Sequence, residues 1–247
     1  MRKLGLVSIS FRKHTPEEII DAVKTAGLSC IEWGSDVHAP CTDLEKVKAV
    51  AKAQADAGIT CCSYGTYFRF GENRPEELAD YIKAAKLLGT DILRLWCGTV
   101  GSRSCTDAQR EALYADCREA ARIAEEHGVT LCMECHNGTL TDWKESALEL
   151  MQTVNSPAFR MYWQPNQRRT EEENMAYAQL LKPYIGHVHA FNWSENERYP
   201  LAHGEAQWKK YLKLLPEDSA LLLEFMPDDR IESLKTEAEA LRKIAGE

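Results

Sequence analysis

The sequence lacks the features that would place it in a membrane or on nucleic acid. No uninterrupted apolar run among its 247 residues approaches the ~18 residues that a membrane-spanning helix needs. Positive charge is also scarce, because 30 Lys and Arg stand against 38 Asp and Glu and give a net charge of −8. The basic residues form only short clusters, such as Arg168-Arg169 and Lys209-Lys210. Since such a chain would repel a phosphate backbone, we expect neither a membrane nor a nucleic acid as its partner.

A secretory signal and a disulfide framework are not apparent either. The sequence begins with Arg2 and Lys3, but only a short apolar stretch interrupted by serines follows, unlike a signal peptide. The nine cysteines are an odd number and lie in apolar segments, which is typical of small buried side chains in a reducing compartment. Cys132 and Cys135 have the spacing of a metal motif, yet residues three apart in a strand point to opposite faces. We therefore predict a cytoplasmic protein with free cysteines.

The clearest feature present is a repeated order of elements. A short apolar run is followed by an amphipathic stretch, then a glycine, then another apolar run. Gly27, Gly58 and Gly89 are 31 residues apart, and Gly128 occupies the same place in the next unit. Glycine is favoured there because a helix C-terminus often needs a left-handed residue. Four capping boxes mark helix starts: Thr15 with Glu18, Thr42 with Glu45, Thr106 with Gln109, and Thr170 with Glu173.

Eight strands are predicted, at residues 4–10, 28–34, 59–64, 92–96, 129–134, 160–164, 185–190 and 220–225. Each is short and apolar on both faces, as expected of a parallel strand covered by helices. An open doubly wound sheet would favour a glycine-rich turn after the first strand, and Ser8–Arg12 contains no glycine. The pattern predicts an α/β fold, a (β/α)8 TIM barrel. No linker divides the chain, so residues 1–247 are expected to be one domain.

Polar residues gather at the predicted carboxyl ends of the strands, where TIM barrels place their active sites. Strand alternation turns Glu134, Gln164, His189 and Glu224, from four successive strands, toward one point. Two carboxylates in an apolar setting repel each other unless a positive charge lies between them. We therefore predict a divalent metal ion, Mn, Co, Zn or Mg, held by these four side chains.

Two alternatives bear on this site. Arg94 could neutralise Glu134 with no metal present, because buried charges must be paired.

His187 is interpreted as a core histidine rather than a ligand. Trp33, Trp163 and Trp193 are interpreted as packing residues, whereas Trp96 shares a face with Arg94 and is the candidate wall beside a sugar ring.

The order of these motifs resembles a known superfamily. Ile31-Glu32-Trp33, Glu134-Cys135-His136, His187-Val188-His189 and Leu223-Glu224-Phe225, spread over eight βα units, are similar to those of the xylose isomerase-like TIM barrels. This superfamily includes ketose 3-epimerases, hydroxypyruvate isomerase, inosose dehydratase and apurinic endonucleases. The resemblance covers essentially the whole chain.

The resemblance implies roles for individual residues. It makes Glu134 and Glu224 the catalytic acid and base and, with His189, metal ligands. The substrate contacts expected around them are Glu32, Arg94, Trp96, His136 and Arg198. Most relatives have an aspartate at the position of Gln164, with a histidine three residues later where this chain has Gln167. The glutamine removes one negative charge and weakens metal binding. With no histidine in Ser63-Tyr64-Gly65, the trinuclear zinc cluster of the endonucleases is not expected.

The activity implied is isomerisation or epimerisation of a small sugar, polyol or sugar phosphate through an enediolate. A metal-dependent dehydratase of a keto-polyol and a metal-free sugar-binding barrel that has lost catalysis are the alternatives. The expected partner is a small carbohydrate, and relatives commonly form dimers or tetramers, so a homo-oligomer is expected.

Overall fold

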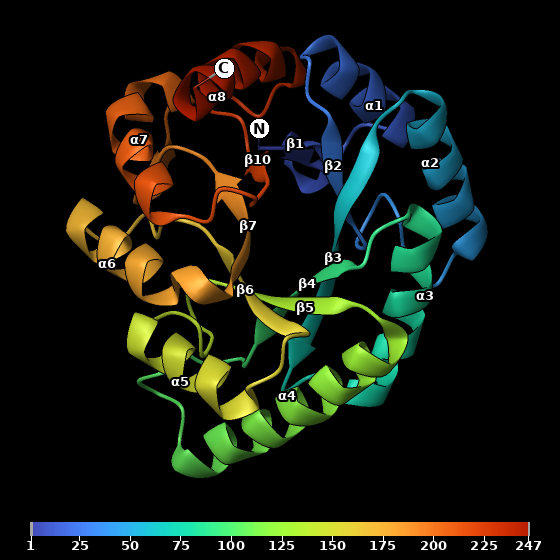
Figure 1. Cartoon of the computed structure of the whole chain (residues 1–247). Coiled ribbons are helices and arrows are strands. Elements are labelled where there is room, and N and C mark those ends of the chain that lie inside the picture. Colours follow the sequence, from blue (N-terminus) through green and yellow to red (C-terminus); the bar gives the residue numbers. More distant parts are fainter. Residues whose placement is uncertain (1, 247) are drawn as a thin grey trace.

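Short apolar strands alternate with amphipathic helices along the chain, and the strands close into a parallel barrel (Figure 1). The computed structural model describes residues 2–246. The order around the barrel is β1-β10-β7-β6-β5-β4-β3-β2. The barrel strands are β1 (Leu4–Val7), β2 (Cys30–Gly34), β3 (Thr60–Phe70), β4 (Ile92–Cys97), β5 (Thr130–Glu134), β6 (Phe159–Trp163), β7 (Ile185–Ala190) and β10 (Leu221–Leu223). The predicted TIM barrel, in a single domain, is confirmed.

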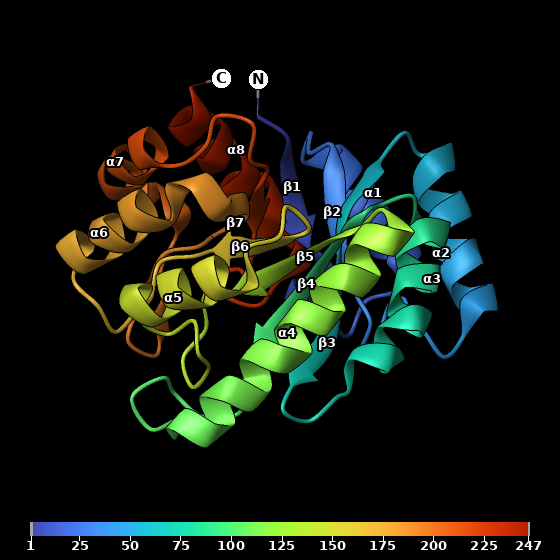
Figure 2. The same ribbon diagram turned by 60° about the horizontal axis from the view of Figure 1, so that its bottom comes forward.

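The helices surround the barrel and separate it from solvent, as Figure 1 shows. They are α1 (Pro16–Thr25), α2 (Leu44–Asp56), α3 (Leu78–Leu88), α4 (Asp107–His127), α5 (Lys144–Val154), α6 (Glu171–Leu181), α7 (Glu205–Leu214) and α8 (Leu234–Ala245). A small antiparallel ribbon follows β7 and consists of β8 (Trp193–Ser194) and β9 (Glu197–Arg198). In Figure 2 the arrowheads of β3 and β4 point away from both termini, so the carboxyl ends of the strands open on the opposite side.

The helix boundaries follow the capping chemistry, with one exception. Capping boxes are present at Thr15, Thr106 and Thr170. The predicted box at Thr42 is wrong. Asp43 caps α2 instead, and its carboxylate accepts a hydrogen bond from Lys46 N at 3.1 Å. An aspartate is as good an N-cap as a threonine, so the helix begins one residue later.

At the carboxyl ends of the strands, three boundaries differ from the prediction by two residues or more. The first strand ends at Val7 because Ser8–Phe11 turn into a 3₁₀ helix. The third strand continues beyond residue 64 to Phe70. The eighth, β10, is only Leu221–Leu223, so Glu224 and Phe225 follow the strand rather than lie in it. All three differences lie at the carboxyl ends of strands, where the site forms.

The core has two layers. A small cluster fills the barrel interior: Val7, Ile9, Cys30, Cys62, Cys132, Tyr162, Ala220 and Leu222. A larger cluster lies between the strands and the helices. Six of the nine free cysteines are buried, as expected of small apolar side chains. Cys132 belongs to the inner cluster and Cys135 packs against the outer one, which confirms that this pair faces opposite ways. Among residues 2–246, no helix has the length and apolar character to cross a bilayer.

A buried glutamine joins the barrel to two of its helices. Gln54 Oε1 accepts a hydrogen bond from Trp33 Nε1 at 2.7 Å, and Gln54 Nε2 donates to Leu88 O at 2.7 Å. Replacing Gln54 with Leu leaves both partners buried without a hydrogen bond, so we expect the free energy of unfolding to fall by roughly 2–4 kcal/mol. Urea denaturation measures this. Gln152→Leu on the exposed face of α5 is the control, with an expected change within about 0.5 kcal/mol. Equal effects of the two substitutions would contradict the assignment.

Candidate active site

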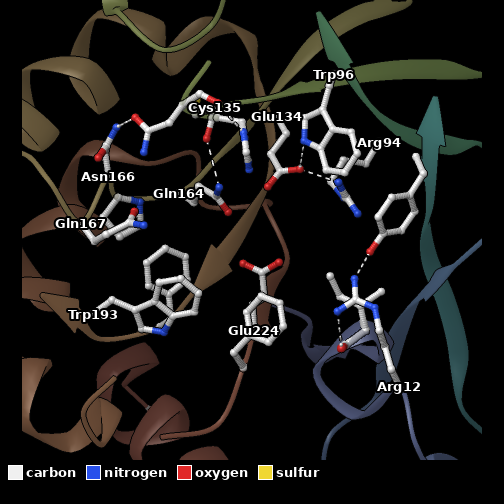
Figure 3. Close-up of a pocket in the computed structure, with 17 residues that line it drawn as sticks. Arg12, Arg94, Trp96, Glu134, Cys135, Gln164, Asn166, Gln167, Trp193 and Glu224 are labelled. Atoms are coloured by element: carbon white, nitrogen blue, oxygen red, sulfur yellow. Dashed lines mark hydrogen bonds and ion pairs between the residues drawn. The ribbon is translucent and has the colours of Figure 1, made fainter. Parts of the chain in front are cut away.

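A cavity of about 220 Å³ opens at the carboxyl ends of the barrel strands (Figure 3). This volume lies below the roughly 300–1,000 Å³ of pockets that bind drug-sized ligands, so the cavity suits a smaller molecule. Its polar lining consists mainly of side-chain amides, together with two arginines and two glutamates. The lining residues are Ile9, Arg12, Tyr67, Arg94, Trp96, Glu134, Cys135, His136, Asn137, Gln164, Pro165, Asn166, Gln167, Phe191, Trp193, Glu224 and Phe225.

Two carboxylates and an imidazole meet at the floor of this cavity. Glu134 ends β5, His189 lies in β7 and Glu224 follows β10, and all three side chains are buried. One ligand atom from each lies within 4.8 Å of the others. His189 Nδ1 is 3.8 Å from Glu134 Oε1 and 3.6 Å from Glu224 Oε2. Figure 3 shows the carboxylates of Glu134 and Glu224 facing each other.

Gln164 completes the floor, and its amide has a defined orientation. Its Nε2 donates to Cys135 O at 3.0 Å, so its Oε1 faces the cluster and lies 3.0 Å from His189 Nδ1. Two atoms that are each about 2.1 Å from one metal ion lie roughly 3.0–3.4 Å apart at coordination angles of about 90–110°. The spacings from 3.0 to 3.8 Å around His189 Nδ1 are therefore close to those of a ligand set. Three oxygens and one nitrogen also suit a borderline-to-hard divalent ion, so these residues fit a metal.

Arg94 neutralises the same cluster from the other side. Its Nε donates to Glu32 Oε1 at 2.7 Å and its Nη1 to Glu134 Oε2, and both partners are buried. Trp96 Nε1 also donates to Glu134 Oε2, at 2.7 Å. The arginine contact considered as an alternative to a metal is thus present. It occupies only one oxygen of Glu134, and Oε1 remains turned toward His189.

Burial and neighbouring charges move the pKa values in opposite directions. Burial alone would raise the pKa of Glu134, but the attraction of Arg94, His189 and His136 holds it below its ordinary value. The pKa of Glu224 is raised, because burial and repulsion by Glu134 outweigh the attraction of His189 and Arg94. Desolvation lowers the pKa of His189, yet the surrounding carboxylates, Glu224 first, raise it above the ordinary value.

Of the five expected substrate contacts, three line the cavity and two do not. Arg94, Trp96 and His136 lie in its wall. Glu32 is fully buried and lies outside the lining, where its Oε2 accepts a hydrogen bond from Ser63 Oγ at 2.5 Å. Arg198 also lies outside the lining. It forms an ion pair with Asp229, and its guanidinium is 5.0 Å from the Trp193 ring. His187 bonds the backbone at Cys62 O, 3.2 Å away, as a core histidine does.

Several lining residues were not identified from the sequence. Tyr67 enters the cavity because β3 bulges against β4: Gly65 pairs with Arg94 and Arg69 with Trp96, so three residues of β3 oppose one of β4. Its backbone is left-handed, with φ of 58°, and such a residue often marks a functional site.

Two further lining residues come from irregular segments. Arg12 comes from the turn after the 3₁₀ helix, and its Nη2 contacts the Tyr67 hydroxyl. Trp193, interpreted as a packing residue, lines the cavity because the β8–β9 ribbon turns it inward. Trp193 also packs against Phe191 and Phe225, as interpreted from the sequence, so it both packs and lines the cavity.

The close approach of Arg94 requires a glycine on the neighbouring strand. A Cβ at Gly65 would lie 2.7 Å from Arg94 Nη2 and 3.0 Å from Glu32 Oε1. Gly65→Ala therefore forces the buried guanidinium to move, and we expect the free energy of unfolding to fall by about 1–3 kcal/mol.

Gly186→Ala on β7 is the matched control, because its nearest contact would be Cys132 Sγ at 3.3 Å. We expect it to cost less. Thermal unfolding of both variants gives the comparison, and a Gly65→Ala protein as stable as the parent would contradict the account of Arg94.

The chain belongs to the family described as xylose isomerase-like TIM barrel, whose model matches residues 20–244. No curated protein matches the sequence.

Similar solved structures support the same fold. A probable 3-DHS dehydratase, AsbF, involved in petrobactin synthesis in Bacillus anthracis, has a TM-score of 0.81 at 19% identity, covering 98% of both chains. A D-psicose 3-epimerase from Clostridium cellulolyticum H10 has a TM-score of 0.72 at 14% identity, covering 99% of this chain and 98% of the other. A xylose isomerase-like TIM barrel protein from Mycobacterium smegmatis, in complex with magnesium, has a TM-score of 0.70 at 15% identity, covering 96% and 91%. At these identities the likeness concerns the fold.

Proposed function

We propose that this protein is a metal-dependent isomerase or epimerase of a small sugar, polyol or sugar phosphate. The observation that carries the proposal is the convergence of Glu134, His189 and Glu224 within 4.8 Å at the floor of a small polar cavity. Membership of the xylose isomerase-like family supports it.

Four side chains would hold the divalent ion: Glu134, Gln164, His189 and Glu224. When bound, the ion would act as a Lewis acid on the carbonyl group of the substrate. It would also reduce the repulsion between the two carboxylates, which lie in a buried setting where unpaired charge is costly. Arg94 and Trp96 anchor Glu134 through its Oε2, so Oε1 keeps its direction. Glu32 acts through Arg94 as a positioning residue.

Glu134 and Glu224 would carry the proton. They face each other across the cavity, so a substrate carbon between them presents a different face to each. One carboxylate removes the proton from the carbon next to the carbonyl and leaves an enediolate. The other carboxylic acid returns a proton to the opposite face, which gives epimerisation, or to the neighbouring carbon, which gives isomerisation.

The walls suit a hydroxyl-rich molecule. Amides from the loops after β5 and β6 (Asn137, Asn166 and Gln167) form one side, and the Trp96 ring forms part of another. Arg94 Nη2 and Trp193 Nε1 are buried and have no hydrogen-bond partner within residues 2–246. Both belong to lining residues, and buried donors of this kind favour a ligand that supplies oxygen atoms.

A dehydratase remains the second candidate, because one similar structure, with a TM-score of 0.81, is a probable 3-DHS dehydratase. The same base could remove the proton next to a carbonyl, and the same acid could then protonate a leaving hydroxyl on the adjacent carbon. The dehydratase reaction would differ from the isomerase reaction only in its substrate, which must carry a leaving hydroxyl on the carbon next to the one that loses the proton. The predicted cytoplasmic location and homo-oligomeric state remain predictions.

The proposed proton transfer is tested by isotope exchange. Candidate ketoses incubated with the protein, Mn²⁺ and deuterated water should gain deuterium next to the carbonyl, as detected by NMR. Because general acid–base groups contribute roughly 10²–10⁴ in rate, Glu134→Gln and Glu224→Gln should each lower the exchange at least ~100-fold.

Glu149→Gln, at an exposed position on α5, is the matched control and should exchange normally. A dehydrated product in the same incubation would identify a lyase instead. No deuterium uptake from any ketose by a folded, metal-loaded protein would contradict the proposal.

The role of Gln164 is tested by a pair of substitutions of equal length. If residue 164 is a ligand, Gln164→Asp should bind Mn²⁺ at least ~10-fold more tightly than Gln164→Asn, which corresponds to about 1.4 kcal/mol. The two variants differ only by a charge, and both lose the hydrogen bond to Cys135 O. Isothermal titration with Mn²⁺ measures the difference. Equal affinities would show that residue 164 does not contact the ion.

A further inference from the structure

A second cavity, of about 290 Å³, lies beside the active-site cavity. It is formed by the turn after β1 together with residues of the loops that follow β7 and β10. The two cavities share Ile9, Arg12 and Phe225 as lining residues. The complete lining of the second cavity is Ile9, Ser10, Phe11, Arg12, Lys13, His14, Arg198, Phe225 and Asp229.

The second cavity is positively charged in an acidic protein. Its lining contains three permanent cations, Arg12, Lys13 and Arg198, and one carboxylate, Asp229, which leaves two positive charges. Asp36, outside the lining, accepts a hydrogen bond from Arg12 Nε at 2.8 Å and reduces the excess to one. The whole chain has a net charge of −8, so this local excess stands out and favours an anionic ligand.

Neighbouring side chains hold the two arginines of this cavity in place, yet N–H groups of Arg198 and Lys13 remain free to donate hydrogen bonds to a ligand. Arg198 lies against two aromatic rings, 4.7 Å from the centre of Phe225 and 5.0 Å from that of Trp193. Its Nη1 contacts Asp229, and no other described residue of 2–246 accepts from its Nε or Nη2. Lys13 is exposed and forms no ion pair with any residue in the described part of the chain. Arg12 is fixed by Asp36 and Tyr67.

Phe225 separates the two cavities and has an unusual backbone. Its φ is 55°, a left-handed value that a phenylalanine rarely adopts. Its N–H donates to Ser10 Oγ at 2.8 Å, which ties the segment after β10 to the turn after β1. Glu224, the proposed proton carrier, is the preceding residue. A substrate held at Glu224 therefore has the positively charged cavity as its next neighbour, on the other side of Phe225.

We infer that the second cavity binds a phosphate group at one end of the substrate whose other end reacts between Glu134 and Glu224. This inference rests on the proposed function and narrows it to sugar phosphates. A phosphate carries about −1.5 to −2 charges at pH 7, which complements the net positive charge that remains at this cavity after Asp229 and Asp36 are counted. TIM barrels also frequently bind phosphate at the loops after the seventh and eighth strands, and Arg198 and Asp229 belong to those loops.

Binding is tested without any reaction, by NMR titration of the isotopically labelled protein with inorganic phosphate. Acetate at equal ionic strength is the control for general salt effects. Phosphate should shift the backbone amide signals of Arg12, Lys13 and Arg198, and acetate should not. Lys13→Gln should weaken phosphate binding at least ~3-fold, since it removes one of three cations. Lys83→Gln, at an exposed position on α3 outside both cavities, should leave it unchanged.

Three results would overturn the inference: no phosphate-specific shifts, shifts confined to the floor around Glu134, or equal effects of Lys13→Gln and Lys83→Gln. Failure of the proposed function is distinguished by the isotope exchange. Deuterium uptake by an unphosphorylated ketose, with no phosphate binding in the second cavity, would keep the isomerase proposal and remove this one. When both hold, a ketose phosphate should have a lower KM than the ketose itself, and Lys13→Gln should raise the KM of the phosphate alone.

Discussion

Three carboxylates, Glu32, Glu134 and Glu224, are buried together at one end of the barrel, and their mutual repulsion is the constraint on which the site depends. An unpaired buried charge costs several kcal/mol. Arg94 offsets Glu32 and Glu134, and His189 lies 3.6 Å from the nearest oxygens of both Glu32 and Glu224. A histidine that binds a metal must be neutral, so Arg94 alone leaves two negative charges unmatched when all three carboxylates are ionised. A divalent ion would supply both missing charges.

The surroundings of the cluster follow from this constraint. The register of β3 against β4 places Gly65 beside Arg94, where a side chain would collide with the guanidinium. Ser63 and Trp96 donate to the carboxylates of Glu32 and Glu134, so their oxygens have partners even where no cation touches them. Gln164 presents an oxygen to His189 because its nitrogen donates to Cys135 O. Each of these contacts fixes one atom of the floor.

The fold and the floor of the site could be predicted from the sequence because they follow short-range rules. Helix ends are local: Gly89 and Gly128 have φ of 81° and 61°, as expected of left-handed helix ends. Alternation along parallel strands is equally local, so Glu134 and His189 could be placed on the inner face of the barrel before any coordinates existed. The structure also places Glu224 beside Glu134 and His189, as predicted, although Glu224 follows β10 rather than lying within it.

The positions of Glu32, Tyr67 and Trp193 could not be predicted, because they depend on strand register and on irregular backbone that the sequence pattern does not reveal. Glu32 points inward like Glu134, but its register opposite Val7 and Ser63 sets it deeper, beneath Arg94 rather than in the cavity. Tyr67 and Trp193 reach the cavity through a bulge and a ribbon that depend on distant contacts.

The most direct measurement of the central claim is anomalous scattering from crystals soaked in Mn²⁺. The account predicts a manganese peak between the carboxylates of Glu134 and Glu224, in contact with His189 Nδ1 and Gln164 Oε1. A floor without a peak at millimolar Mn²⁺, with His189 still bonded to Gln164, would contradict it.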